Sequence, residues 1–334
     1  MKAAVCYEFG QLLVVEEVVI DPPKAGEVKV KLAACAICHS DIHYAEGAWG
    51  GSLPAIYGHE ASGVVTEVGP GVTRTKLGAH VVVTLMRSCG HCHLCVRGDL
   101  HLCETKFSMD TESRIFNEQG HPVLQGLRTG AFAEYVVVHE SQLVSVPVEI
   151  PLDSVALLGC AVITGLGAVI NTARVSSGSS VAVIGLGGVG LNCVQGAMLV
   201  GAQPVIAVDL AENKLEAAKV FGATHTINGT TANVREAVRD FTGQRGADYV
   251  FVAVGRVAAM EQGLTLLRRG GTLVIAGMPA SGVKMQFEPV ILADRGQCIL
   301  GSKMGSTRLG MDVPKLVELY QQGRLKLDEL ISAR

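Results

Sequence analysis

Short apolar alternations dominate the first 160 residues of the chain. Val28–Leu32, Ala61–Val68 and His80–Leu85 are alternations of strand length. Turn-forming sequences such as DPPKAGE and GPGV separate runs of this kind. The pattern predicts a mainly β domain over residues 1–160.

The pattern changes near residue 161, where apolar strands begin to alternate with segments of helical periodicity. Such repeated β-then-α units predict a parallel, doubly wound sheet over residues 161–300. The last part of the chain, residues 301–334, contains VPKLVELYQQGRLKLDELI, which predicts a helix and a short tail that returns toward the first domain. The predicted strands of the sheet are Val181–Ile184, Val205–Val208, Tyr249–Val252, Leu273–Ala276 and Ile299–Leu300.

Length and charge narrow the class of protein. With 334 residues, 49% of them hydrophobic and 18% charged, the chain has enough apolar material for two compact cores. A net charge of −3 with scattered lysines and arginines argues against a nucleic-acid partner. The uncharged stretches Ser154–Ala173 and Val175–Val208 are interrupted by glycines, so buried sheet and helices are expected rather than membrane spans. With no secretory pattern at the N-terminus, we expect a cytoplasmic protein.

Four of the ten cysteines lie close together in the stretch CGHCHLCVRGDLHLC. In a reducing compartment such clusters indicate metal or redox chemistry rather than disulfides. Cys89, Cys92, Cys95 and Cys103 can present four thiolates tetrahedrally to one zinc ion, which leaves no open position and therefore predicts a structural site. A redox loop is the alternative. His91, His93 and His101 could replace one ligand, but we expect them to be solvated.

A glycine motif follows the first strand of the predicted sheet. Gly185, Gly187 and Gly190 form G-x-G-x-x-G within SSVAVIGLGGVGLN, and Asp209 closes the next strand. This arrangement predicts a dinucleotide site, with the pyrophosphate at the helix N-terminus and Asp209 on the ribose hydroxyls. A carboxylate there repels a 2′-phosphate and Leu210 offers no compensating charge, so NAD is favoured over NADP. A glycine-rich turn without a ligand is the alternative.

A second metal set is suggested by three separated residues. Cys38 lies in CHSD and His59 in YGHEASG, and either alone is more often an ordinary buried residue. Together they offer the sulfur and imidazole ligands of a catalytic zinc, for which Cys160 in LLGCAVITG is the best third ligand.

These motifs resemble those of the zinc-containing medium-chain alcohol dehydrogenases, closest to the branch that includes glutathione-dependent formaldehyde dehydrogenase. The resemblance covers essentially the whole chain. It implies an α/β protein with a GroES-like, mainly β catalytic domain and a Rossmann domain, assembled as a homodimer or homotetramer. The motifs that carry it are CHSD, GHEASGVVTEVGPGV, the four-cysteine loop, FAEYVVV, LLGCAVITGLGAVINTA and GLGGVGLN.

The resemblance also implies a role for individual residues. It assigns the catalytic zinc to Cys38, His59 and Cys160, and a structural zinc to the four-cysteine loop, giving two zinc ions per subunit. Asp41 would orient the histidine ligand and Glu60 could approach the metal. Ser40 and His43 would form a proton relay. The implied cofactor contacts are His39, Thr164, Gly185, Gly187, Gly188, Val189, Gly190, Asp209 and Lys214.

The expected chemistry is reversible hydride transfer between an alcohol and NAD⁺ (EC 1.1.1.1). Two thiolates and one imidazole leave zinc able to act as a Lewis acid on an alcohol oxygen. The proton would leave through Ser40, the nicotinamide ribose and His43, and the zinc-bound alkoxide would transfer hydride to form an aldehyde or ketone. The alternatives are oxidation of S-hydroxymethylglutathione, and a non-enzymatic NAD-sensing zinc protein.

Some features depart from the family pattern. The resemblance implies a further helix and strand beyond LDELISAR, with a late basic contact to the cofactor. Residues 109–135 differ in detail from the segment that walls the family's substrate pocket. Trp49 is expected either to line that pocket or simply to pack. The remaining cysteines, Cys6, Cys35, Cys193 and Cys298, are expected to be buried thiols.

Overall fold

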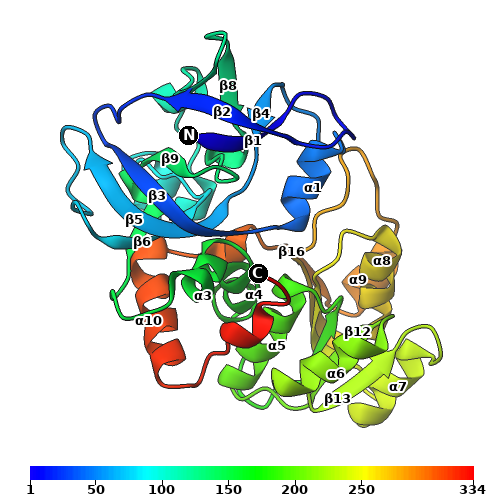
Figure 1. Ribbon diagram of the computed structural model, residues 1–334. Helices are drawn as coiled ribbons and strands as arrows, with labels where there is room; N and C mark the ends of the chain where they lie inside the picture. Colours follow the sequence, from blue (N-terminus) through cyan, green and yellow to red (C-terminus); the bar gives the residue numbers. More distant parts are fainter. The chain divides into compact units, whose positions relative to one another are not determined.

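The computed structural model describes residues 1–334 and shows two compact units (Figure 1). The first unit consists of Met1–Cys160, Arg308–Gly323 and Leu327–Arg334. The second consists of Ala161–Thr307 and Arg324–Lys326. Each unit is therefore discontinuous in sequence.

The first unit is built on β structure, as the apolar alternations predict. One set of strands closes into a barrel in the order β1-β2-β7-β8-β4, and a five-stranded sheet has the order β10-β6-β5-β3-β9. The barrel strands are β1 (Lys2–Cys6), β2 (Val14–Ile20), β7 (Ile115–Asn117), β8 (Pro122–Gln125) and β4 (Ala55–Ile56). The sheet strands are β10 (Leu143–Ser145), β6 (His80–Thr84), β5 (Glu60–Val68), β3 (Glu27–Ala36) and β9 (Tyr135–His139).

Alternating valines form the core of the five-stranded sheet. Val28 and Val30 of β3, Val81 and Val83 of β6 and Val136 of β9 are buried in one cluster. Side chains two positions apart point to the same face of a strand, so these valines cover one side of the sheet. Ala61 and Val65 of β5 belong to the same buried cluster, and β5 begins directly after His59.

Short helices connect the strands of the first unit. The α-helices are α1 (His39–Ala45), α2 (His93–Val96), α3 (Leu152–Ala156) and α10 (Leu309–Gln321). The 3₁₀ turns are η1 (Leu100–Leu102), η2 (Ser108–Asp110), η3 (Gly126–Arg128), η4 (Glu140–Gln142), η5 (Leu157–Gly159) and η8 (Asp328–Leu330).

The second unit contains a six-stranded sheet in the order β13-β12-β11-β14-β15-β16, with every pair parallel. The predicted doubly wound sheet is thus confirmed. Its strands are β11 (Val181–Ile184), β12 (Val205–Asp209), β13 (His225–Asn228), β14 (Ala247–Val252), β15 (Leu267–Ile275) and β16 (Cys298–Gly301).

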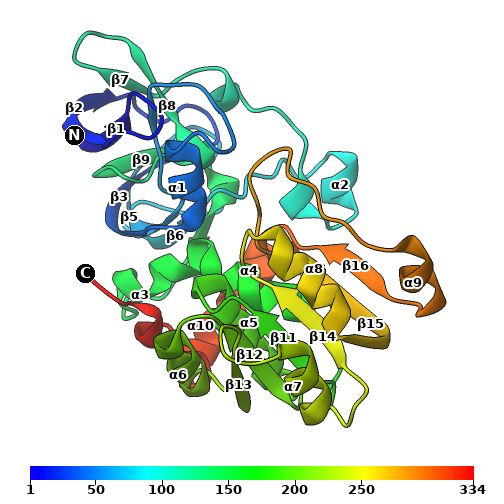
Figure 2. The ribbon, with the colours of Figure 1, turned by 90° about the vertical axis from the view of Figure 1, so that its right-hand side faces the viewer.

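Helices connect these parallel strands, as crossovers require (Figure 2). Because such crossovers are right-handed, the helices that move the chain toward β13 and those that move it toward β16 cover opposite faces of the sheet. The crossover helices are α5 (Gly188–Leu199), α6 (Glu212–Val220), α7 (Val234–Phe241), α8 (Val257–Leu266) and α9 (Pro289–Asp294). The helix α4 (Ala161–Gly167) and the π-helical turn η6 (Ala168–Thr172) precede β11, and the 3₁₀ turn η7 (Met304–Ser306) follows β16.

Two expectations need correction. The helix predicted within VPKLVELYQQGRLKLDELI begins earlier, at Leu309, and the Asp312 carboxylate in its first turn accepts the Arg308 N–H at 2.8 Å. Cys298 was expected to be buried, but it is exposed, because it starts the edge strand β16, which pairs with β15 alone.

No single helix of the chain is both long and apolar enough to cross a membrane. Only a bent pair, Leu152–Gly159 with Ala161–Thr172, meets the length and composition requirements.

Candidate functional site

Three residues far apart in the sequence converge in the first unit. The ligand atoms of Cys38, His59 and Cys160 all lie within 4.8 Å of one another, with 3.3 Å between His59 Nε2 and Cys160 Sγ. His59 is fully buried and Cys160 is 6% exposed. Two sulfurs and one imidazole nitrogen form a donor set that suits zinc, and three protein ligands leave the fourth tetrahedral position open.

Asp41 fixes the orientation of this group. Its Oδ1 accepts hydrogen bonds from His59 Nδ1 and from the Gly58 N–H, both at 2.9 Å, and its Oδ2 accepts the Cys38 N–H at 2.9 Å. Because Nδ1 is engaged by the carboxylate, Nε2 faces the two sulfurs. A buried carboxylate in this position is the usual partner of a metal-binding histidine.

The charges of the group are set by its own neighbours. The hydrogen bond with Cys160 outweighs burial and, with His59, lowers the pKa of Cys38 to about 3. Burial lowers the pKa of His59, but hydrogen bonds with Asp41 and Cys38 raise it to about 10. The hydrogen bond with Cys38, together with burial, raises the pKa of Cys160. This buried site therefore stabilises a thiolate and attracts positive charge, which fits a cation.

Two glycines allow the backbone next to His59 and Cys160 to pack closely against neighbouring segments. Gly58 has a φ of +89°, and a Cβ there would lie 2.6 Å from the Phe132 nitrogen. A Cβ on Gly159 would lie 2.7 Å from the Val83 carbonyl oxygen and 3.0 Å from the Glu60 Cα. Neither position accepts a side chain without backbone movement, so both glycines set the places of the ligands that follow them.

The four-cysteine loop forms a second group in the same unit. The sulfurs of Cys89, Cys92, Cys95 and Cys103 also lie within 4.8 Å of one another. Cys89 Sγ accepts hydrogen bonds from Thr105 Oγ1 at 3.0 Å and the Cys92 N–H at 3.2 Å, and the Thr105 contact is the main cause that lowers the pKa of Cys89 to about 5. Four sulfurs complete a tetrahedral shell without histidine.

Thr105 was not found from the sequence, because an isolated threonine two positions after a cysteine carries no distinctive signal. His91 and His93 are exposed, as expected of solvated loop residues. His101 is half-buried.

Helix α1 carries the predicted relay residues. Ser40 and His43 are one turn apart and so lie on the same side of the helix. The His43 ring is 4.9 Å from the Trp49 ring and 4.8 Å from the His39 ring, and its Nδ1 is buried without a hydrogen-bond partner. Burial lowers the pKa of His43. Glu60, next to His59, is also buried.

The glycine motif forms the turn between β11 and α5 in the second unit. Gly185 has a φ of +89°, and a Cβ on Gly190 would lie 1.8 Å from the Gly185 carbonyl oxygen. Gly187 is the N-cap of α5, and a Cβ there would meet nothing within 4 Å. The first and third glycines are thus required by the fold, while the second leaves open space at the helix N-terminus, where phosphate groups bind in other proteins.

Asp209 ends β12 beside this turn. Its carboxylate accepts the N–H groups of Leu186 at 2.7 Å, Leu210 at 2.8 Å and Ala211 at 3.1 Å. Of the other predicted cofactor residues, Lys214 is exposed on α6 and Thr164 is buried on α4, where its Oγ1 lies 3.8 Å from Met304 Sδ. His39 is exposed at the start of α1, in the first unit.

Two protein-family profiles match the chain. The alcohol dehydrogenase GroES-like domain matches residues 24–148, and the zinc-binding dehydrogenase family matches residues 188–322. The alcohol dehydrogenase class-3 of Zea mays is 40% identical over 347 residues, which cover 99% of this chain and 89% of that protein. The chain belongs to the zinc-binding alcohol dehydrogenase family.

Solved structures of this family show the same fold. Benzyl alcohol dehydrogenase from Acinetobacter calcoaceticus has a TM-score of 0.92 at 32% identity, covering 98% of this chain and 91% of that one. A zinc-binding dehydrogenase from Sinorhizobium meliloti 1021, solved bound to NADP, has a TM-score of 0.83 at 29% identity, covering 99% and 91% of the two chains. The predicted GroES-like and Rossmann architecture is confirmed.

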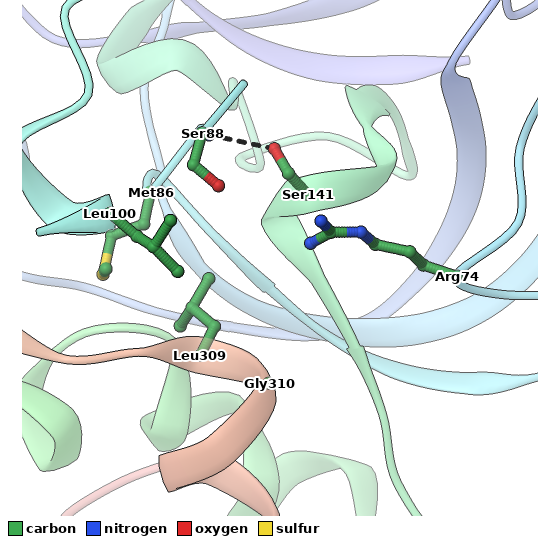
Figure 3. Close-up of a pocket in the computed structure, with 7 residues that line it drawn as sticks. All are labelled: Arg74, Met86, Ser88, Leu100, Ser141, Leu309 and Gly310. Atoms are coloured by element: carbon green, nitrogen blue, oxygen red, sulfur yellow. Dashed lines mark hydrogen bonds between the residues drawn. The ribbon is translucent and has the colours of Figure 1, made fainter. Parts of the chain in front are cut away.

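Two cavities of this dehydrogenase, each within a single unit, lie apart from the predicted residues. Figure 3 shows one of about 20 Å³, next to Ser88, whose N–H donates to Ser141 Oγ at 3.0 Å. It holds about one water molecule and is too small for a substrate. A larger cavity of about 480 Å³ lies between α8 and α9 of the second unit, and none of its lining residues is a predicted site residue.

Proposed function

We propose that the chain is an NAD-dependent alcohol dehydrogenase that interconverts an alcohol with an aldehyde or ketone. The observation that carries this proposal is the convergence of Cys38, His59 and Cys160, with Asp41 behind the histidine, in a chain that also has a dinucleotide-type turn. The three ligands would hold a catalytic zinc, and the four-cysteine loop would hold a structural one.

When bound, zinc supplies a Lewis acid that polarises an alcohol or carbonyl oxygen. The chain's own side chains would orient the ligands and transfer the proton. Asp41 holds the imidazole of His59 in one tautomer, and Ser40 would accept the alcohol proton at its hydroxyl. His43 suits the end of a relay, because its buried Nδ1 has no other partner and its lowered pKa keeps it able to accept a proton.

NAD rather than NADP is the proposed cofactor. The Asp209 carboxylate faces no cation among its hydrogen-bond partners, which are three backbone N–H groups. The following residue, Leu210, is 69% exposed and cannot neutralise a phosphate. A carboxylate at this position binds ribose hydroxyls and repels a 2′-phosphate.

Zinc analysis together with kinetics tests the proposal. The wild type should contain two zinc ions per chain and form NADH from alcohols. Cys38→Ser should contain one, lose turnover and still bind NADH. Cys6→Ser is the matched control, because Cys6 is a buried thiol of the same unit whose hydrogen bond to the Glu8 carbonyl serine can replace. Turnover retained in Cys38→Ser would refute the catalytic assignment.

A second candidate is the oxidation of a glutathione adduct of formaldehyde. It is favoured by the 40% identity to a protein named alcohol dehydrogenase class-3 and by the branch that the motifs resemble. Formaldehyde oxidation that requires added glutathione would support it, and equal turnover of simple alcohols without thiol would refute it. A wild type with one zinc and no turnover on any alcohol would instead indicate the NAD-sensing alternative.

We further propose a homodimer or homotetramer assembled through β16. This strand pairs on one side only, with β15. The segment that leads into it exposes several apolar side chains, and edge strands of this kind pair readily with a second copy. Val290→Asp should weaken the assembly in analytical ultracentrifugation. The exposed side chains are Met278, Val283, Phe287, Val290 and Ile291.

We propose the cytoplasm as its compartment. The proposed metal sites depend on six cysteine thiolates, and a reducing environment keeps such thiols unpaired.

A further inference from the structure

The short segment that carries Cys160 is fastened by two serine hydroxyls. Ser62, on β5 three residues after His59, donates its hydroxyl to the Leu152 carbonyl oxygen at 2.5 Å. Ser154, on α3, donates its hydroxyl to Asp328 Oδ1 at 2.5 Å. Ser154 is only 1% exposed, so its hydroxyl has little access to water in place of this partner.

Asp328 belongs to the C-terminal part of the first unit, where a second contact holds it. The Tyr320 hydroxyl, from α10, donates to both carboxylate oxygens at 3.0 Å. The preceding residue, Leu327, is completely buried. Asp328 is therefore a fixed acceptor, anchored by α10 and by its neighbour in the core.

The segment between Ser154 and Cys160 couples the position of the Ser154 side chain to that of the Cys160 sulfur. Val155 and Leu158 are fully buried, and α3 continues without a break through η5 to Cys160. Gly159 already lies against β5 and β6, as its missing Cβ shows. In close-packed surroundings such a segment moves as one piece, so a shift at Ser154 displaces the sulfur six residues later.

We propose that Ser154 and Asp328 are positioning residues for Cys160, so that the C-terminal segment of the chain controls how firmly the three-ligand site retains its metal. This inference rests on the proposed function, because it takes Cys160 as a ligand of the catalytic zinc. The two residues touch neither metal nor substrate.

The test uses Ser154→Ala and Asp328→Ala in the full-length, cobalt-substituted enzyme, with metal release to a chelator as the readout. Cobalt bound by thiolates absorbs visible light, and Cys38→Ser supplies the reference spectrum of the four-cysteine site alone. Both alanine variants should release cobalt from the three-ligand site on the order of three- to tenfold faster. Asp328→Asn keeps an acceptor oxygen and should restore most of the retention.

Ser180→Ala is the matched control. Ser180 is a buried serine whose hydroxyl donates to the Asp248 carboxylate at 2.6 Å, so its loss removes the same kind of bond in the second unit rather than in the unit that holds the metal ligands. It should lower the melting temperature to a similar degree but leave cobalt release unchanged.

Several outcomes would overturn the inference. Release from Ser154→Ala and Asp328→Ala that matches Ser180→Ala would show that the bonds only stabilise the fold. Equal acceleration at the four-cysteine site would show a general loosening. Since Asp328 is exposed, its variants remain informative even if Ser154→Ala does not fold. A wild type that binds a single cobalt would instead refute the metal assignment itself.

Discussion

Asp41 and His59 share a buried hydrogen bond of 2.9 Å between Oδ1 and Nδ1, across 18 residues of sequence. The second carboxylate oxygen accepts the Cys38 N–H. One side chain thus orients two of the three proposed metal ligands at once.

Asp41→Asn should therefore weaken zinc binding at the three-ligand site by about 10- to 100-fold. A carboxamide has one acceptor oxygen, so either His59 Nδ1 or the Cys38 N–H would face a donor. Zinc affinity measured by chelator competition checks this. The four-cysteine site serves as the internal control, and unchanged affinity at the three-ligand site would contradict the role of Asp41.

Gly190→Ala should destabilise the second unit strongly, by more than about 3 kcal/mol, since its Cβ would lie 1.8 Å from a backbone oxygen that cannot move away cheaply. Gly187→Ala should leave the free energy of unfolding nearly unchanged, because its Cβ meets open space. The same Cβ should nevertheless lower cofactor affinity, since it would occupy the approach to the helix N-terminus. Urea unfolding and NADH fluorescence titration separate the two effects. Equal stability of the two variants would argue against this division.

Asp209→Asn should raise the KM for NAD by about 10- to 100-fold and reduce the preference over NADP. The three backbone N–H groups that the carboxylate accepts would be only partly satisfied, and the charge that repels a 2′-phosphate would be lost. The measurement is kcat/KM with both cofactors. An unaltered ratio would mean that another group sets cofactor choice.

Asp248 supplies a pH-dependent contribution to stability. Burial raises the pKa of its carboxyl, but hydrogen bonds from Ser180 and Arg268 lower this pKa by more than burial raises it. The pKa therefore lies below its ordinary value of 3.8. A carboxyl whose pKa is lower in the folded state stabilises the fold fully above that ordinary value and loses its effect as the pH falls through the folded pKa.

Asp248→Asn should accordingly be less stable than the wild type by about 1 kcal/mol at pH 7, after allowance for solvent screening. The amide nitrogen would face the Arg268 guanidinium that now pairs with the carboxylate. The difference should shrink below about pH 4. Denaturant unfolding at both pH values tests the sign, and a difference that grows on acidification would contradict it.

Much of this fold follows from local sequence signals. Val181–Ile184 was predicted with the bounds that the structure shows, because a buried parallel strand is a continuous apolar run between turn residues. The glycine motif could also be predicted from the sequence, because Gly185 and Gly190 are required by the backbone geometry of the turn in which they lie. Cys298 was misjudged because a thiol looks the same in sequence at an edge strand and in a core.

The contacts that connect distant segments could not be predicted. Ser62 meets the Leu152 carbonyl 90 residues later, and Ser154 meets Asp328 across 174 residues. The sequence around a single serine does not show whether its hydroxyl bonds to a distant residue or to water, because the partner depends on which segments the tertiary fold brings together. The same holds for Thr105, whose hydroxyl reaches Cys89 only once the loop has closed.

The discontinuity of the first unit has a consequence for biosynthesis. Its proposed metal ligands are all translated by residue 160, but α10 and the segment that holds Asp328 emerge only after the whole Rossmann sheet has been made. Domains generally fold as units during synthesis. Co-translational folding of the first unit can therefore finish only after the sheet of the second unit has been translated.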